Sequence, residues 1–194
     1  MANPALDFQA TLVERGVTLS IEYTVKNQTA NDIGLFNRIT AVRPDGTLLL
    51  SSDLAYVELQ DELLLVRKLA LPIPEGLRMA AYVPPYVSRV AAEELFVEHF
   101  SLTLPARVMQ PFKRALLQGQ VAADKPAVAK AVRLEIGYFA LDSSAQLSMS
   151  NPAYPQLFSA MPPGVAVSRQ HVFSRDFALR QAVPVLDYRA VPWR

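Results

Sequence analysis

The sequence predicts an all-β fold, a single antiparallel β-sandwich, from three observations. Val17–Asn27 alternates between apolar and polar residues without a miss, and Val132–Tyr138 repeats the pattern. Side chains of an extended strand alternate between its two faces, so each stretch has one apolar and one polar face. Such strands are typical of antiparallel sheets with one face on a core. The 15 prolines among 194 residues exceed the usual share of about 5%, which favours short elements between turns over a helical bundle.

The first half of the chain contains most of the predicted strands. Alternation and turn residues place them at residues 6–12, 17–27, 33–42, 47–50, 55–59, 63–71, 79–83 and 95–104. Turns are expected at Glu14–Gly16, at Arg43–Gly46 and at Gln60–Glu62. Gly34 indicates a bulge or a close backbone approach within its strand.

The second half is sparser and decides the number of domains. Two long loops are expected at 105–131 and 142–164. The spacing of Val108, Phe112 and Leu116 leaves room for one short helix in the first, although Pro111 weakens it. Strands are predicted at Val132–Tyr138, Val165–Phe173 and Phe177–Tyr188. Three strands separated in this way do not form an independent sandwich, so residues 1–194 are predicted to be one domain.

Composition excludes several classes of protein. The net charge of +1 argues against broad capture of nucleic acid. No apolar run approaches the roughly 18 residues of a membrane-spanning helix, so we expect a soluble protein with no span. The absence of cysteine excludes disulfides and thiolate metal sites. No signal peptide is visible at the N-terminus, which favours a cytoplasmic location, with a periplasmic one as the alternative if a leader preceded this chain.

Signatures of catalysis are scarce in the sequence. His99 and His171 have no further ligand at metal-binding spacing, so no metal is expected. No nucleophile elbow and no glycine-rich phosphate loop occurs, so no cofactor is expected either. Arg107, Lys113 and Arg114 cluster beside Phe112, and we interpret them as a solvated loop with one anchoring aromatic ring.

Two kinds of binding residue remain as candidates. Tyrosine–proline loops can present rigid aromatic contact surfaces, and these loops supply Tyr82, Tyr86, nearby Arg89, and Tyr154. The alternative is that the tyrosines only cover the edge of the core. A candidate interface comes from apolar residues opposite the expected core side of their strands, which are Phe36, Leu64, Val66 and Phe139. They point to a homo-oligomer or a protein partner, unless the long loops cover them.

Three segments carry a resemblance to a known group of folds. KNQTANDIGL after an alternating strand, then RPDG, then RVAAEELFVEHFSLTLP, resembles bacterial immunoglobulin-like sandwich domains over residues 17–104. In that group an Asn-led turn follows an early strand, and a glycine-containing turn precedes a late one, where this chain has Ala91–Ala92. VPPYVSRV resembles a segment of the pilus-chaperone family, and immunoglobulin-like proteinase inhibitors are a further alternative. The resemblance implies a fold and carries over no functional residue.

These observations favour a non-catalytic binding or assembly module that acts through a sheet face, an edge or loops. The alternative is an enzyme with a site on the long loops 105–131 and 142–164. A deep pocket with converging polar groups is typical of the enzyme, whereas a flat apolar patch is typical of a partner surface.

Overall fold

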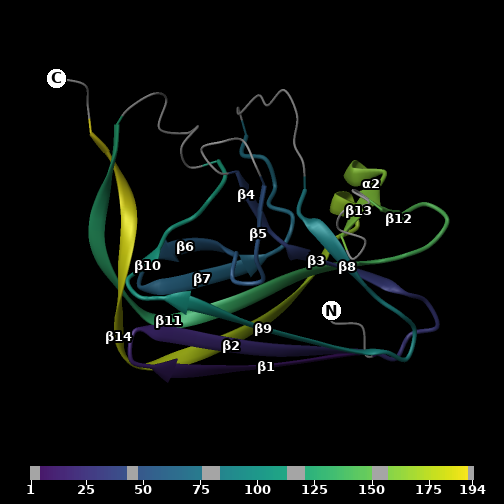
Figure 1. The fold of residues 1–194 in the computed structure, drawn as a ribbon, viewed down its shortest axis with the longest axis horizontal. Helices are drawn as coiled ribbons and strands as arrows, with labels where there is room; N and C mark the ends of the chain where they lie inside the picture. The colour runs from purple at the N-terminus through teal and green to yellow at the C-terminus, as the bar shows by residue number, and fades with distance from the viewer. Residues whose placement is uncertain (1–4, 43–47, 76–83, 113–120, 150–156, 192–194) are drawn as a thin grey trace.

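Strands make up almost all of the regular secondary structure in the computed structural model, which describes residues 5–42, 48–75, 84–112, 121–149 and 157–191 (Figure 1). The strands in chain order are β1 Leu6–Arg15, β2 Thr18–Asn27, β3 Ile33–Arg38, β4 Thr40–Val42, β5 Leu48–Leu50, β6 Tyr56–Gln60, β7 Leu63–Lys68, β8 Tyr86–Val90, β9 Leu95–Thr103, β10 Ala106–Arg107, β11 Val121–Ala140, β12 Gln146–Met149, β13 Phe158–Met161 and β14 His171–Val191. One short helix, α2, spans Pro163–Ser168. The predicted all-β class is confirmed.

Two main sheets face each other across the core. The smaller is antiparallel with the order β1-β2-β9. The larger has nine strands, ordered β10-β14-β11-β3-β8-β13-β12, and β7 joins β11 with β6 on its far side. The pairings of β7 with β11 and of β10 with β14 are parallel, so this sheet is mixed and the prediction of an all-antiparallel arrangement was wrong. β4 and β5 form a separate two-stranded ribbon.

The predicted hairpins of the first half are present. Gly16, with φ of 55°, lies in the turn between β1 and β2. Asp61 and Glu62 have φ of 47° and 68°, as in a two-residue turn that matches the twist of the paired strands β6 and β7. Gly34 makes the expected close approach, because a Cβ built there would lie 2.7 Å from the Phe139 ring. The predicted turn at Arg43–Gly46 and the predicted strand at 79–83 both lie outside the described residues.

The second half departs from the prediction. Instead of one loop over 105–131, the structure has β10 and the start of β11, and Pro126 lies within β11 opposite Leu186. The 142–164 region contains β12, β13 and the start of α2. The strand predicted at Val165–Phe173 begins as the end of this helix, where Pro163 occupies a first-turn position that proline favours, and only His171–Phe173 belong to a strand, β14. The last strand is longer than predicted and runs from His171 to Val191.

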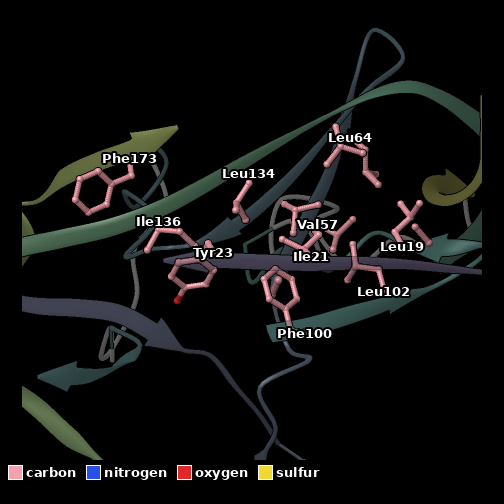
Figure 2. Packing of buried hydrophobic residues seen from close by; sticks show 14 of the residues in the cluster. Leu19, Ile21, Tyr23, Val57, Leu64, Phe100, Leu102, Leu134, Ile136 and Phe173 are labelled. Atoms are coloured by element: carbon pink, nitrogen blue, oxygen red, sulfur yellow. The ribbon is translucent and has the colours of Figure 1, made fainter. Parts of the chain in front are cut away.

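The main core lies between the two sheets, as Figure 2 shows. β2 contributes Leu19 and Ile21, β9 contributes Phe100 and Leu102, and β11 contributes residues of the opposite layer such as Leu134. Burying each such side chain stabilises the fold by about 1.5–3 kcal/mol relative to exposure. The apolar residues of the alternating pattern in β2 and β9 therefore face the core.

A second core lies on the other face of the large sheet. Phe36 and Phe139 are fully buried there, with ring centroids 4.9 Å apart. Ala145, Ala160 and Ala166 pack against them from the 142–164 region and from α2. The face that looked open in the sequence is thus covered by the chain itself.

Candidate functional site

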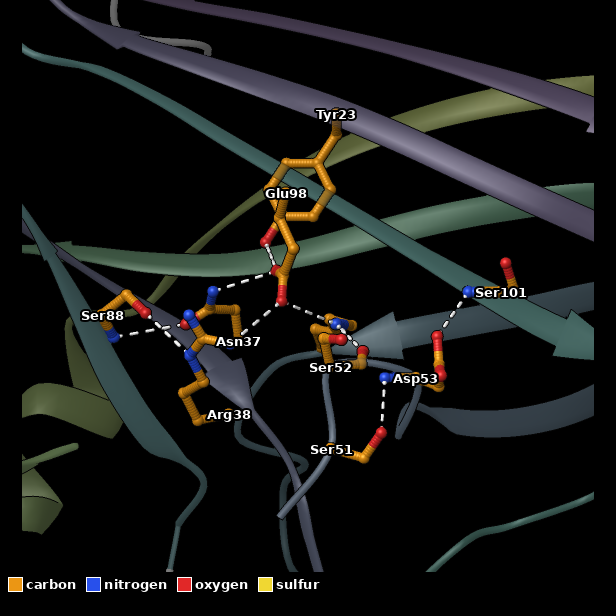
Figure 3. Close-up of polar contacts among 10 residues, drawn as sticks. Tyr23, Asn37, Arg38, Ser51, Ser52, Asp53, Ser88, Glu98 and Ser101 are labelled. Atoms are coloured by element: carbon orange, nitrogen blue, oxygen red, sulfur yellow. Dashed lines mark hydrogen bonds and ion pairs between the residues drawn. The ribbon is translucent and has the colours of Figure 1, made fainter. Parts of the chain in front are cut away.

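A buried cluster of charged and polar groups joins the two sheets (Figure 3). Glu98 of β9 is 6% exposed and lies directly across from Tyr23 of β2, which is fully buried. Both occupy core-facing positions of their strands. From the large sheet come Asn37 and Arg38 at the end of β3 and Lys68 at the end of β7. A carboxylate of one sheet is therefore surrounded by donors of the other.

Every oxygen of Glu98 has partners. Oε2 accepts hydrogen bonds from the Tyr23 hydroxyl and from Asn37 Nδ2, the latter at 3.0 Å. Oε1 lies 3.2 Å from Lys68 Nζ and 3.4 Å from Arg38 Nη1. Asn37 Oδ1 in turn accepts the Ser88 backbone N–H at 3.2 Å. A buried carboxylate needs such compensation, because its transfer out of water is otherwise very unfavourable.

Lys68 is the most unusual member of the cluster because its side chain is completely buried. Its Nζ donates to the Ser52 carbonyl at 2.6 Å and lies 4.1 Å from the centre of the Phe100 ring. Burial lowers the pKa of the Lys68 ammonium below its ordinary value, and Glu98 opposes that shift. Burial and then the Glu98 charge raise the pKa of Tyr23 well above its usual range. The tyrosine therefore keeps its proton, and the cluster fixes the two sheets relative to one another.

A groove lies beside the start of β2 and the end of β9, next to β14. In the β11–β14 ladder Ala129 pairs with Val183, but Ala131 pairs with Ala178, so one residue of β11 faces four residues of β14. The bulge at residues 179–182 forms one wall of an open groove of about 560 Å³. Figure 1 shows the turn between β1 and β2 beside this bend of β14. A bulge of this kind redirects side chains and often accompanies a functional site.

The lining of the groove is mostly apolar. The apolar residues are Val17, Leu19, Leu104, Pro105, Ala182, Val183 and Pro184, and the polar ones are Glu14, Arg180 and Gln181. Leu19 and Val183 are buried and form the floor, whereas Val17 is 67% exposed. Glu14 Oε1 accepts the Arg180 backbone N–H at 2.9 Å, which ties the bulge to β1.

Two further hollows, of about 500 and 290 Å³, lie at the opposite end of β1. They share Leu6, Tyr138 and His171 in their walls. The Tyr138 ring stacks on Phe173, with centroids 4.1 Å apart, and His171 lies 5.4 Å from Tyr138. Tyr138 and Phe173 are each only 6% exposed, so these rings offer little surface to a ligand.

The structure does not gather the sequence-predicted binding residues into one site. Tyr86 and Arg89 lie in strand β8 and not in a loop, and Arg89 pairs with Asp32, Nη2 to Oδ2 at 2.5 Å. Asp32 also accepts the Ala92 N–H at 2.9 Å, so Arg89 helps to fix the turn before β9. Tyr82 and Tyr154 lie outside the described residues.

The four candidate interface residues are all buried within the chain. Leu64 and Val66 point into the core between the sheets, while Phe36 and Phe139 belong to the second core. β7 is covered on both faces, because Leu65 between them is also buried. The exposure that an interface requires is therefore missing, and the covering by residues 142–164 is the observed explanation for Phe36 and Phe139.

Sequence reasoning missed both the buried cluster and the groove. The cluster has a readable signal, because Glu98 continues the core-facing series of Phe100 and Leu102, and Lys68 continues that of Leu64 and Val66. A charged residue at such a position must find a partner. The groove has no comparable signal in the sequence. It depends on the bulge, in which the single residue Lys130 of β11 lies opposite four residues of β14.

Metal binding and membrane spanning find no support in the described ranges. No group of three or more His, Asp or Glu side chains lies close enough there to hold a metal ion. His99 and His171 lie on different strands, β9 and β14. No described helix has the length and apolar character to cross a bilayer.

Comparison of the chain with protein-family models, curated proteins and solved structures finds no match. The resemblance to immunoglobulin-like domains thus rests on the sequence segments alone, and function must be argued from the geometry.

Proposed function

We propose that the chain is a non-catalytic binding module, an immunoglobulin-like β-sandwich in type, whose ligand occupies the groove beside the bulge of β14. The observation that carries this proposal is the groove itself. Its volume of about 560 Å³ lies within the roughly 300–1,000 Å³ typical of ligand sites. Its floor draws on both sheets, with Leu19 from one and Val183 from the other.

The distribution of polarity in the groove favours binding over catalysis. Buried apolar side chains form the floor, and the charged groups Glu14 and Arg180 belong to its lining at β1 and at the bulge. Catalysis by acid and base requires groups held within hydrogen-bond reach of one reacting centre. The polar groups that do converge, around Glu98, are buried apart from the partly exposed Arg38 and use one another as partners.

The alternative is an enzyme with its site on residues 105–131 and 142–164. It stays a prediction, because residues 113–120 and 150–156 lie outside the part of the chain that the structure describes. Assembly through a sheet edge also stays open, but the four buried apolar residues no longer motivate it.

The test uses Nile red, a neutral apolar dye whose fluorescence rises in apolar surroundings. Ala182 lines the groove and is exposed, so Ala182→Trp fills the groove at little cost to the fold. Ala178→Trp is the matched control, because Ala178 is exposed on the same strand outside the groove. We expect saturable one-to-one binding by the unmodified chain and by Ala178→Trp, and its loss in Ala182→Trp. Unchanged binding by Ala182→Trp, with circular dichroism like that of the unmodified chain, contradicts the proposal.

A further inference from the structure

We infer that the groove takes a monocarboxylate with an apolar body, and that the Arg180 guanidinium binds the carboxylate. This inference rests on the proposed function and names the class of ligand for the same site. It starts from the charge that the groove offers to an incoming molecule.

Arg180 lines the groove and, like Arg15 and Arg175, has no acidic partner among the described residues. Arg89, Arg107, Arg133 and Arg169 each pair with an aspartate at 2.5–2.8 Å. Among the described residues, no ion pair or hydrogen bond involves the Arg180 guanidinium, although Arg180 is exposed and lines the groove. Guanidinium groups bind carboxylates through two parallel hydrogen bonds, which makes a carboxylate the best-fitting partner.

Glu14 is the competing charge in the groove and must be considered with Arg180. It holds the bulge through its hydrogen bond to the Arg180 backbone N–H, at 2.9 Å. That bond occupies Oε1 and places the acid on the β1 side, while the Arg180 side chain has no such engagement. A cationic ligand would choose Glu14 instead, so the sign of the preferred ligand charge tests the assignment directly.

The apolar floor supplies the second recognition element. Leu19 and Val183 are 1% and 4% exposed, and Leu104, Pro105 and Pro184 extend the apolar surface around them. Burial of an alkyl or aromatic body on this floor adds a favourable apolar contribution that grows with the area removed from water. An apolar floor beside the Arg180 guanidinium fits an amphipathic acid such as a short fatty acid.

The experiment titrates the purified chain with nonanoate, octan-1-ol and octylammonium by calorimetry, because these probes carry the same eight-carbon tail and differ only in the head group. We expect nonanoate to bind most tightly and octylammonium most weakly. Arg180→Gln is expected to lower the affinity for nonanoate roughly three- to tenfold. This range lies between the contribution of an exposed ion pair and that of a charge-assisted hydrogen bond. The binding of octan-1-ol by this variant should stay unchanged.

Two further variants separate charge from shape. Glu14→Gln keeps an oxygen for the Arg180 N–H but removes the negative charge, so nonanoate should bind about two- to fivefold more tightly. Arg175→Gln is the matched control, because Arg175 is exposed on the same strand and does not line the groove. It should bind all probes as the unmodified chain does.

The outcomes distinguish this inference from the proposed function. Three results would overturn the carboxylate assignment while leaving Nile red binding intact. They are equal affinity for nonanoate and octan-1-ol, higher affinity for octylammonium, and an equal drop in affinity for all three probes in Arg180→Gln. If neither the probes nor Nile red binds, the proposed function itself fails.

Discussion

Replacing Glu98 with glutamine removes one negative charge from the core and leaves the buried Lys68 ammonium without its anion. The amide keeps nearly the same volume and still accepts the Tyr23 hydroxyl, so the change is mainly electrostatic. Lys68 then retains the Ser52 carbonyl at 2.6 Å and the Phe100 ring. Removing one partner of a buried ion pair costs about 3–5 kcal/mol, and we expect a loss of that size in the free energy of unfolding.

The size of this loss should depend on pH, because Lys68 can give up its proton. Burial already lowers the Lys68 pKa, and removing the opposing Glu98 charge lowers it further. In the unfolded chain a lysine titrates near 10.4, so between these two pKa values the unfolded state holds more protons than the folded state. The stability of the variant therefore rises with pH, by up to about 1.36 kcal/mol per pH unit. The wild type gains less, so the difference between the two should be smaller at about pH 9 than at pH 7.

Urea unfolding followed by circular dichroism, at these two pH values, measures the effect. Tyr23 does not interfere, because its raised pKa and the ordinary value of about 10 both lie above this range. Glu22→Gln is the matched control, since Glu22 is an exposed glutamate on β2 and should change stability by less than about 0.5 kcal/mol. Lys68→Met combined with Glu98→Gln should recover roughly 2 kcal/mol, because the unpaired cation is gone. A loss below about 1 kcal/mol in Glu98→Gln, or strict additivity in the double variant, would refute the reasoning.

Two other substitutions test how the cores are closed. Phe139→Ser should destabilise the fold by about 3–5 kcal/mol, because the ring is fully buried against Phe36, and a melting temperature like that of the unmodified chain would contradict its burial. Asn27→Ala should lower the free energy of unfolding by about 2–4 kcal/mol, measured by urea unfolding. The reason is that Nδ2 donates to the carbonyls of Asn31, Val90 and Ala91, while Oδ1 accepts from the Thr29 backbone N–H. Thr24→Ala on the same strand serves as the control. If Asn27→Ala costs no more stability than Thr24→Ala, the hydrogen bonds of the Asn27 side chain do not contribute to the stability of the fold.

Strict alternation predicted the parts of the fold that have one wet face. β1, β2 and β9 form the smaller sheet, which covers the core on one side only, and there a period of two is visible in the sequence. Strands covered on both faces lose this pattern. β7, with Leu64, Leu65 and Val66 all buried, reads as a plain apolar run, so the sequence does not tell which side faces which core.

Pairing partners and long strands were not predictable for a different reason. β11 pairs with β14 on one side, and with β7 and then β3 on the other, so its position is fixed by contacts far away in the sequence. Its first part, with Pro126, has little local strand character, and tertiary pairing overrides that weak preference. The groove inherits this limit, since the bulge depends on the register between β11 and β14.

The buried cluster and the groove share two strands, with the cluster near the middle of each strand and the groove at one end. β2 carries Tyr23 in the cluster and Leu19 in the groove, separated by the core residue Ile21. β9 carries Glu98 in the cluster, and Leu104 follows directly after its end. Apolar contacts are not directional, so they would tolerate several positions of one sheet against the other. The hydrogen bonds and ion pairs of Glu98 are formed in few of these positions. We therefore expect the cluster to limit how the two sheets sit against each other, and with that the distance between Leu19 and Val183 on the floor of the groove.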